Sequence, residues 1–151
     1  MGRPDQMSRC PTIPAVLIPS AMFANAAGAE NGLLVLQGGG WEWFNLRSFP
    51  GTVHGVVAGL IELEPGHPPT QIEASVTGPG IDGLVFGSQL IEDPTEGNIG
   101  CRMPLVVPLT FVAWEPGLHV VNITDAAGPL TSLELDVRLL APLPDGPPDL
   151  D

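Results

Sequence analysis

The sequence contains no lysine, and charged residues of either sign are few. Lysine plus arginine total 5, all of them arginine, against 17 aspartates and glutamates, which gives a formal net charge of −12. Such a chain offers no basic surface that could neutralise phosphates, so we expect neither nucleic acid nor an anionic membrane as a partner. Charged residues make up only 15% of the chain, and a surface this poor in charge favours association with protein.

Cysteine is also scarce, and the motifs that carry chemistry are missing. Cys10 and Cys101 are too few for a disulfide framework, and we interpret both as free thiols. The serines lack the G-x-S-x-G elbow of hydrolases, and His54, His67 and His119 show no metal-binding spacing. The sequence therefore predicts no catalytic residue, no metal ligand and no cofactor, and it favours a non-enzymatic protein without excluding an enzyme.

No apolar run reaches the ~18 residues of a membrane span. The N-terminus does imitate a signal peptide, because Arg3 and Arg9 precede the apolar residues 13–23 and Ala24-Asn25-Ala26 has the small-x-small form of a cleavage site. Two prolines interrupt that apolar stretch, however, which argues against a signal helix. We expect a cytoplasmic protein, with export after cleavage near Ala26 as the alternative.

Helical periodicity is nearly absent, and alternation with period two dominates instead. Residues 133–139 alternate strictly between aliphatic and charged side chains, which is typical of a half-buried strand. Residues 71–77 alternate similarly and stop at a Gly-Pro-Gly turn. Further segments that favour strands are residues 33–37, 53–63, 84–91, 105–112 and 118–124. About seven strands at this spacing predict an all-β fold, a single antiparallel β-sandwich of the immunoglobulin-like type.

One domain is expected, with residues 13–140 forming the sandwich. Residues 1–12 are expected to be a flexible N-terminal arm, and the Pro- and Asp-rich residues 141–151 a disordered tail. Pro108 lies within the predicted strand 105–112 and cannot donate to a β-ladder. That strand is therefore expected at a sheet edge or at a bulge.

Gly38, Gly39 and Gly40 precede the aromatic segment of the chain. A phosphate cradle would need a following helix, whereas Trp41 begins an aromatic segment without helical character. The three glycines therefore favour a tight bend or a close backbone approach, against which Trp41 packs. Residues 78–83 match the G-x-G-x-x-G pattern, but its proline fixes a turn and a strand follows, so no dinucleotide site is expected.

The aromatic segment carries the most specific prediction. In an extended strand, Trp41 and Trp43 share one face while Glu42 and Phe44 take the other. Burying the tryptophans is cheaper, because burying Phe44 would draw Glu42 into the core. We therefore expect Trp41 and Trp43 to be buried and structural, with Phe44 and Leu46 forming an outward patch that contacts a partner.

Residues 21–41 run from Ala-Met-Phe-Ala-Asn-Ala-Ala to Gln-Gly-Gly-Gly-Trp. With residues 106–109 and 115–123 they resemble a family of small, uncharacterised actinobacterial proteins with the motifs Ala-Asp-Ala-Ala, Asp-Gly-Lys-Leu and Leu-Gly-Gly-Gly-Trp. Asn25, Leu33 and His119 stand where that family has aspartate, lysine and tyrosine. The resemblance implies a sandwich fold and no activity, and it places the signal-like stretch in the first strand. His119 is expected to point into the sandwich as a structural residue.

These observations favour a non-enzymatic, protein-binding or assembly module, whose partner is another copy of itself or a different protein. One alternative is a small-ligand binder or an enzyme whose site forms only in the folded chain, with His54 and His67 as its candidate members. A further alternative is an exported cell-envelope protein.

Overall fold

The computed structural model describes residues 16–92 and 101–141, and these residues form strands and turns without a helix. The strands are β1 (Val16–Glu30), β2 (Leu33–Trp41), β3 (Trp43–Leu46), β4 (Gly51–Leu63), β5 (Thr70–Gly78), β6 (Ile81–Ile91), β7 (Cys101–Ala113), β8 (Gly117–Asp125) and β9 (Gly128–Leu139). The predicted all-β fold is confirmed. Within the described part of the chain, no helix is long and apolar enough to span a membrane.

Every segment that the alternation predicts as a strand is one, but the count of about seven is too low, since the described residues hold nine. Alternation alone does not reveal β1, whose small residues and two pairing irregularities blur the pattern, nor β3, which has 4 residues. The pairing is also not purely antiparallel, because β3 runs parallel to β9.

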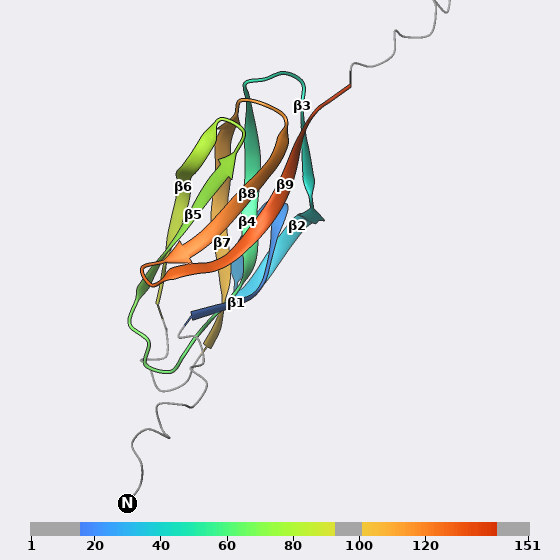
Figure 1. Ribbon diagram of the computed structural model, residues 1–151. Helices are drawn as coiled ribbons and strands as arrows, with labels where there is room; N and C mark the ends of the chain where they lie inside the picture. The colour runs from blue at the N-terminus through green and yellow to red at the C-terminus, as the bar shows by residue number, and fades with distance from the viewer. Residues whose placement is uncertain (1–15, 93–100, 142–151) are drawn as a thin grey trace, which may run out of the picture.

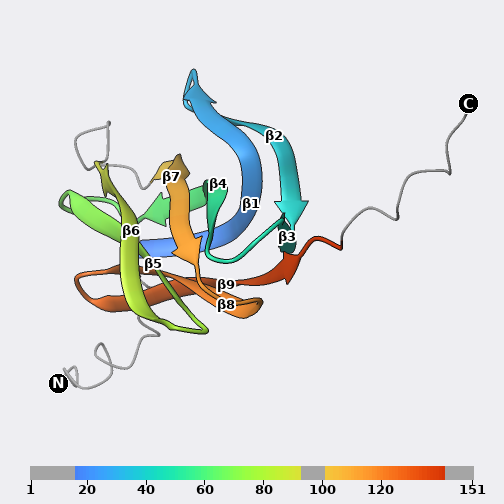
Figure 2. The same ribbon diagram turned by 90° about the horizontal axis from the view of Figure 1, so that it is seen from above.

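The strands form two layers (Figure 1). One sheet has the order β2-β1-β4-β7, and the other has the order β3-β9-β8-β5-β6. β1 joins β4 through its first half and β2 through its second half, and Figure 2 shows how strongly it bends between them. The chain passes from the first sheet to the second between Trp41 and Trp43, so the aromatic segment lies at the junction of the layers.

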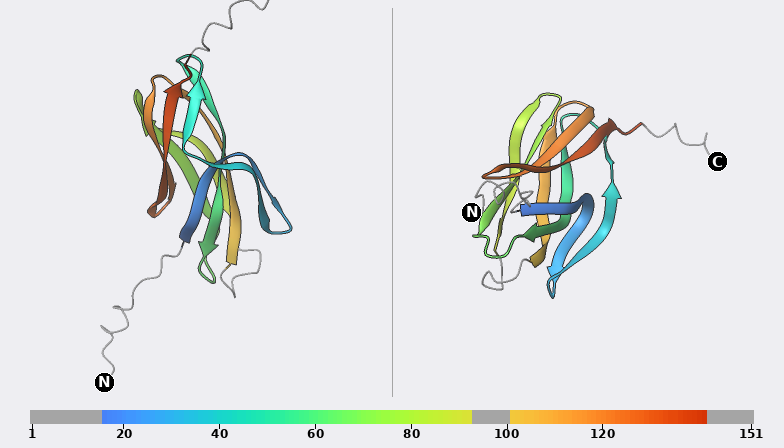
Figure 3. Two further views of the ribbon diagram at one scale, coloured as in Figure 1. Left: turned by 90° about the vertical axis from the view of Figure 1, so that its right-hand side faces the viewer. Right: turned by 60° about the horizontal axis from the view of Figure 1, so that its bottom comes forward.

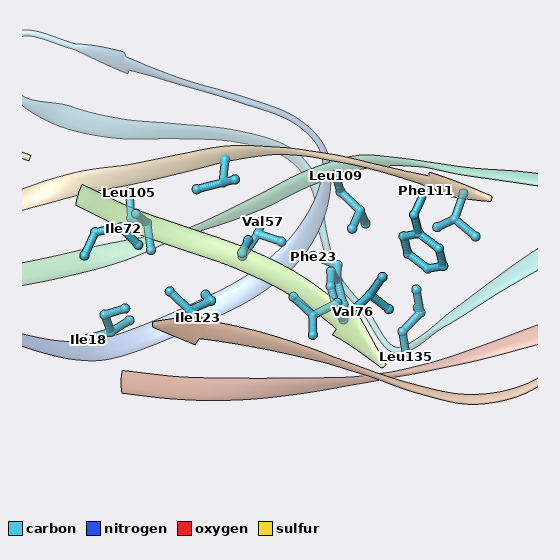
Figure 4. Close-up of a cluster of buried hydrophobic side chains, with 14 of the residues drawn as sticks. Ile18, Phe23, Val57, Ile72, Val76, Leu105, Leu109, Phe111, Ile123 and Leu135 are labelled. Carbon is cyan, nitrogen blue, oxygen red and sulfur yellow. The ribbon is translucent and has the colours of Figure 1, made fainter. Parts of the chain in front are cut away.

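The inward faces of both sheets form one hydrophobic core (Figure 4). Val57 and Leu109 contribute from the first sheet, and Ile72, Ile123 and Leu135 from the second; all five are fully buried. Each such side chain stabilises the fold by about 1.5–3 kcal/mol relative to exposure. The alternation read from residues 71–77 and 133–139 therefore predicts the correct inward positions at Ile72 and Leu135.

One flank of the sandwich, between β6 and β7, is closed. The Gln89 side-chain oxygen accepts a hydrogen bond from the Val106 backbone N–H at 2.9 Å, which ties the two sheets together. A Cβ on Gly87 would lie 2.7 Å from the Val107 side chain, so only glycine permits this approach. Pro108 lies on β7, which is an edge strand as expected, and its missing N–H costs no sheet hydrogen bond there.

The second half of β1 and β2 form a two-stranded hairpin that extends away from the rest of the sandwich (Figure 3). Asn31 and Gly32 both have positive φ, 53° and 74°, as the tight hairpin turn requires. At the base of the hairpin, Phe23 pairs with Trp41 and Ala24 pairs with Gly39, so Gly40 is the extra residue of a β-bulge. Its φ of 90° suits glycine.

All described strands lie within residues 13–140, the predicted domain. The described strands run from Val16 to Leu139 and belong to one two-layered body with one core. The expected N-terminal arm, residues 1–12, lies outside the described residues, and so does the expected tail apart from Ala141.

Candidate functional site: a groove between β1 and β9

The second flank of the sandwich, between β1 and β9, carries a groove of about 660 Å³. The two strands lie side by side in Figures 1 and 3 without pairing. β1 forms one wall, β9 forms the other, and the aromatic segment closes one end. The lining of the groove includes the side chains of Phe23, Trp41, Trp43, Ser132, Glu134 and Asp136.

The aromatic segment can close the end of the groove because the chain leaves strand geometry at Glu42 and crosses from one sheet to the other. The Glu42 carbonyl accepts a hydrogen bond from the Asp136 N–H at 2.9 Å, and this bond begins the parallel pairing of β3 with β9. The pairing covers Asp136 to Leu139 and ends with a hydrogen bond from the Leu140 N–H to the Leu46 carbonyl at 2.7 Å. β3 therefore protects only the last part of the β9 edge.

Trp41 packs against the core as expected, but the expected orientation of Trp43, Phe44 and Leu46 is wrong. Trp43 is 50% exposed, Leu46 is only 8% exposed, and Phe44 is half-buried against the core. The prediction assumed one continuous strand, but Glu42 lies between β2 and β3, and period-two alternation does not pass through it. Glu42 stays exposed, so placing Phe44 inward draws no carboxylate into the core.

Trp41 is the inner member of the aromatic cluster. Its ring stacks on Phe23 with centroids 5.2 Å apart and contacts Phe44 at 5.7 Å. It also covers Gly55, where an added Cβ would lie 2.9 Å from the indole. The indole N–H is buried and has no hydrogen-bond partner among the described residues. Trp41 is thus packed against the core while it lines the groove.

The triple glycine leaves space for side chains of β1 beside this cluster. A Cβ on Gly38 would lie 2.3 Å from the Asn25 side chain, and one on Gly39 would lie 3.0 Å from the Met22 sulfur. Together with the bulge at Gly40, these positions combine a bend with close packing of side chains, whereas the expected close approach of another backbone segment is not seen at Gly38 or Gly39. The packing of Trp41 against the core depends on this local backbone geometry.

Trp43 is held in place by polar neighbours although it is half exposed. The Arg138 guanidinium lies 5.3 Å from the centroid of the Trp43 ring, within the range of a cation–π contact. Asp136 accepts a hydrogen bond from the Arg138 Nε at 2.7 Å. Among the described residues, Glu42 and Glu134 have no ion-pair partner. The groove therefore combines a positioned indole with an excess of negative charge.

The part of β9 that faces the groove also has an open backbone edge. In an antiparallel pair, alternate residues direct their N–H and C=O groups to opposite sides of the strand. The Asp136 N–H points away from β8, toward Glu42. Ser132 and Glu134 lie four and two residues before Asp136 in the regular stretch of β9, so their N–H and C=O groups point to the same side as those of Asp136. Within the described ranges no strand pairs with them on that side.

The three histidines lie outside the lining of the groove. His54 packs edge-on against Phe44 at 5.4 Å, His67 Nδ1 lies 2.6 Å from the Pro68 carbonyl oxygen, and neither lines the groove. His119 is fully buried beside Phe111 and points into the sandwich, with its Nδ1 2.9 Å from the Gly117 carbonyl oxygen. Across residues 16–92 and 101–141, no three His, Cys, Asp or Glu side chains are placed to hold a metal ion.

Sequence reasoning missed most of the groove. The polar side of β9 consists of Ser132, Glu134, Asp136 and Arg138. The alternation of residues 133–139 predicts only that the charged side of this strand faces away from the core. The meeting of these polar residues with the aromatic segment depends on pairing between residues more than ninety positions apart. The predicted contact residues, Phe44 and Leu46, face the core instead of solvent. The interpretation of Cys10 and Cys101 as free thiols stays a prediction, because Cys10 lies outside the described residues.

No protein-family model matches this chain, and no curated protein matches it. Among solved structures, a beta-glucosidase from Listeria innocua is similar with a TM-score of 0.48 and 15% identity. A mutant of the same enzyme in complex with laminaribiose has a TM-score of 0.47 and 15% identity. Each match covers 66% of this chain but only 15% of the other chain, so this chain spans a small part of the proteins it matches.

Proposed function

We propose that this protein is a non-enzymatic protein-binding module and that the groove between β1 and β9 is its binding surface. The observation that supports this function best is Trp43, a half-exposed indole fixed by Arg138 and Asp136 at the mouth of the groove. The exposed half of the Trp43 indole makes no contribution to the packing of the protein itself, so its exposure calls for another explanation. Tryptophan is enriched among the residues that dominate binding energy in protein interfaces.

Preorganisation is the physical basis of the proposed binding. A partner that covers Trp43 gains apolar burial without first having to order the indole, because Arg138 and Asp136 already orient it. Truncating such an anchor typically costs about 2 kcal/mol or more, which is about a 30-fold loss of affinity. The partner is either a second copy of the chain or a different protein.

A small-ligand binder is the second candidate, and the groove also supports it. Its volume of about 660 Å³ falls within the range of about 300–1,000 Å³ that is usual for ligand pockets. The buried Trp41 N–H lacks a partner and is a donor that a polar ligand could satisfy. Trp41→Phe removes this donor, so it should weaken a small ligand and leave the binding of a protein at Trp43 nearly unchanged.

We also propose that the sandwich is of the immunoglobulin-like type. The order β9-β8-β5-β6 corresponds to the G-F-C-C′ order of such sandwiches, and β4 and β7 would be the B and E strands of the facing sheet. His119 lies near the start of β8, where the corresponding strand of many such domains carries a tyrosine that bonds to nearby backbone.

A cytoplasmic location is likewise proposed, and the role of β1 supports it. Cleavage near Ala26 would remove the whole segment that pairs with β4, including Phe23 at 3% exposure and Ala24 at 0%. An export route that used this cleavage would destroy part of the sandwich. The intact mass of the native protein tests this point directly.

The experiment that tests the proposed function compares two tryptophans of similar exposure. Trp43 is 50% exposed in the groove, and Trp114 is 56% exposed between β7 and β8. Partners captured from the native cells by wild-type protein should be lost with Trp43→Ala and retained with Trp114→Ala. Their binding should then be measured with purified components. Equal capture by both variants would place the binding surface elsewhere, and sedimentation of the wild type would show whether the partner is a second copy.

A further inference from the structure

We propose that the groove receives an extended, basic peptide segment of another protein, which adds a strand to the open edge of β9 at Ser132 and Glu134. This inference rests on the proposed function and specifies the class of partner. It requires three properties of the groove: unpaired backbone groups in strand geometry, accessible space beside them, and a charge that selects the partner.

The backbone groups follow from the pairing of β9. The N–H of Asp136 donates to Glu42, and the N–H of Leu140 donates to Leu46, so even-numbered residues here direct their backbone groups away from β8. The register with β8 is regular from Thr131 upward. Ser132 and Glu134 therefore offer donors and acceptors at the spacing of a β-ladder, in direct continuation of the bonds that β3 makes.

The groove leaves this edge accessible. Ser132 and Glu134 are exposed, and the opposite wall is formed by β1 at Ala21 and Met22. From Ser132 to Asp136 the strand advances about 13 Å at the usual rise per residue, enough to pair with a segment of about four residues. Trp43 stands at the end of this stretch, where it can cover an apolar side chain of the added strand.

The charge of the groove favours a basic segment. Glu42 and Glu134 have no ion-pair partner in the described part of the chain, and Asp136 already engages Arg138, so the lining is acidic. The whole chain carries a formal net charge of −12. A second copy carries the same charge and is repelled at long range, whereas a basic segment is attracted. Opposite charges on adjacent strands also stabilise the pair.

Binding through the backbone can be separated from binding through charge alone. The probe is a labelled, end-capped octapeptide of alternating arginine and valine, tested with the full chain by fluorescence anisotropy. A second peptide of the same sequence is N-methylated at every residue, which removes the backbone donors of both edges and keeps every charge. We expect saturable binding of the first peptide and at least about tenfold weaker binding of the second. Equal affinities would overturn the proposal.

Variants of the chain test the same edge from the other side. Ser132→Pro removes the outward N–H without removing a bond to β8, and it should weaken the peptide about tenfold, whereas Ser132→Ala should bind like the wild type. Glu134→Gln should weaken binding and reduce its dependence on salt. If Ser132→Pro fails to fold, the N-methylated peptide with the wild-type chain still decides the matter.

The outcomes also distinguish this inference from the function on which it rests. Absence of any binding at about 1 mM arginine–valine peptide in low salt would overturn the peptide inference. If native partners are nevertheless lost with Trp43→Ala, the groove still binds protein, but of another class. If Trp43→Ala captures the same partners as the wild type, the proposed binding surface itself is wrong, whatever the peptides do.

Discussion

The two flanks of the sandwich, where an edge of one sheet meets an edge of the other, differ in that one is closed and the other is open. Between β6 and β7, Gly87 lets the sheets approach and Gln89 ties them together through the Val106 N–H. Between β1 and β9, the two strands do not pair and a groove separates their side chains. An edge of β9 is unpaired within the described residues, and the Trp43 indole is 50% exposed. Sheet edges are an aggregation hazard that folds normally cover. An edge left open beside a fixed Trp43 is therefore the better candidate for function.

The largest expected effect comes from removing the β1 wall of the open flank. A chain that starts at Ala27 lacks Val16, Ile18 and Phe23, all at most 8% exposed, and it lacks the strand that pairs with β4. The lost burial is about 5–9 kcal/mol, comparable with the whole stability of a domain. We expect no cooperative thermal transition by circular dichroism. Two results would contradict this account and favour export: a folded chain that starts at Ala27, or an intact mass of the native protein that corresponds to a start at Ala27.

The next effect concerns the closed flank. Gly87→Ala would place a Cβ 2.7 Å from the Val107 side chain and 3.0 Å from the Pro108 carbonyl oxygen, so β6 and β7 must separate. Overpacking of this kind costs about 1–3 kcal/mol in the free energy of unfolding, measurable by chemical denaturation. Gly28→Ala is the matched control, because nothing lies within 4 Å of a Cβ there. Equal stabilities of the two variants would show that the flank is not tightly closed.

A smaller effect is expected from the bond that ties this flank. Gln89→Leu removes the acceptor of the Val106 N–H, which should cost about 1 kcal/mol and increase hydrogen exchange at Val106. Gln37→Leu changes the same residue type on the exposed hairpin and should be close to neutral. Unchanged exchange at Val106 would mean that water or another group replaces the side chain.

The smallest effect lies at the open flank. Arg138→Gln removes the cation over the Trp43 ring and the ion pair with Asp136, both at exposed sites. The free energy of unfolding should change by less than about 1 kcal/mol. The indole resonance of Trp43 in an NMR spectrum should shift and broaden, while that of Trp114 stays. An unperturbed Trp43 resonance would show that Arg138 does not position it.

How far the sequence predicts this molecule depends on the range of the interactions involved. Strict alternation in residues 71–77 and 133–139 identifies strands and their buried faces, because one face of each meets the core. The same rule fails from Trp41 to Leu46, because the chain changes sheets at Glu42 and the alternation of inward and outward side chains is interrupted there. No local sequence pattern predicts that change of sheet. The groove depends further on the pairing of β3 with β9 and on the bend of β1, and both arise from tertiary contacts.

The most direct test of the contrast between the flanks is the affinity of the purified native partner for three full-length proteins: the wild type, Trp43→Ala and Trp114→Ala. Both variants should unfold with nearly the wild-type free energy, because both indoles are at least half exposed. Calorimetry should show a loss of about 30-fold or more for Trp43→Ala, and no change beyond about twofold for Trp114→Ala. Equal affinities of the two variants would contradict a binding function for the open flank.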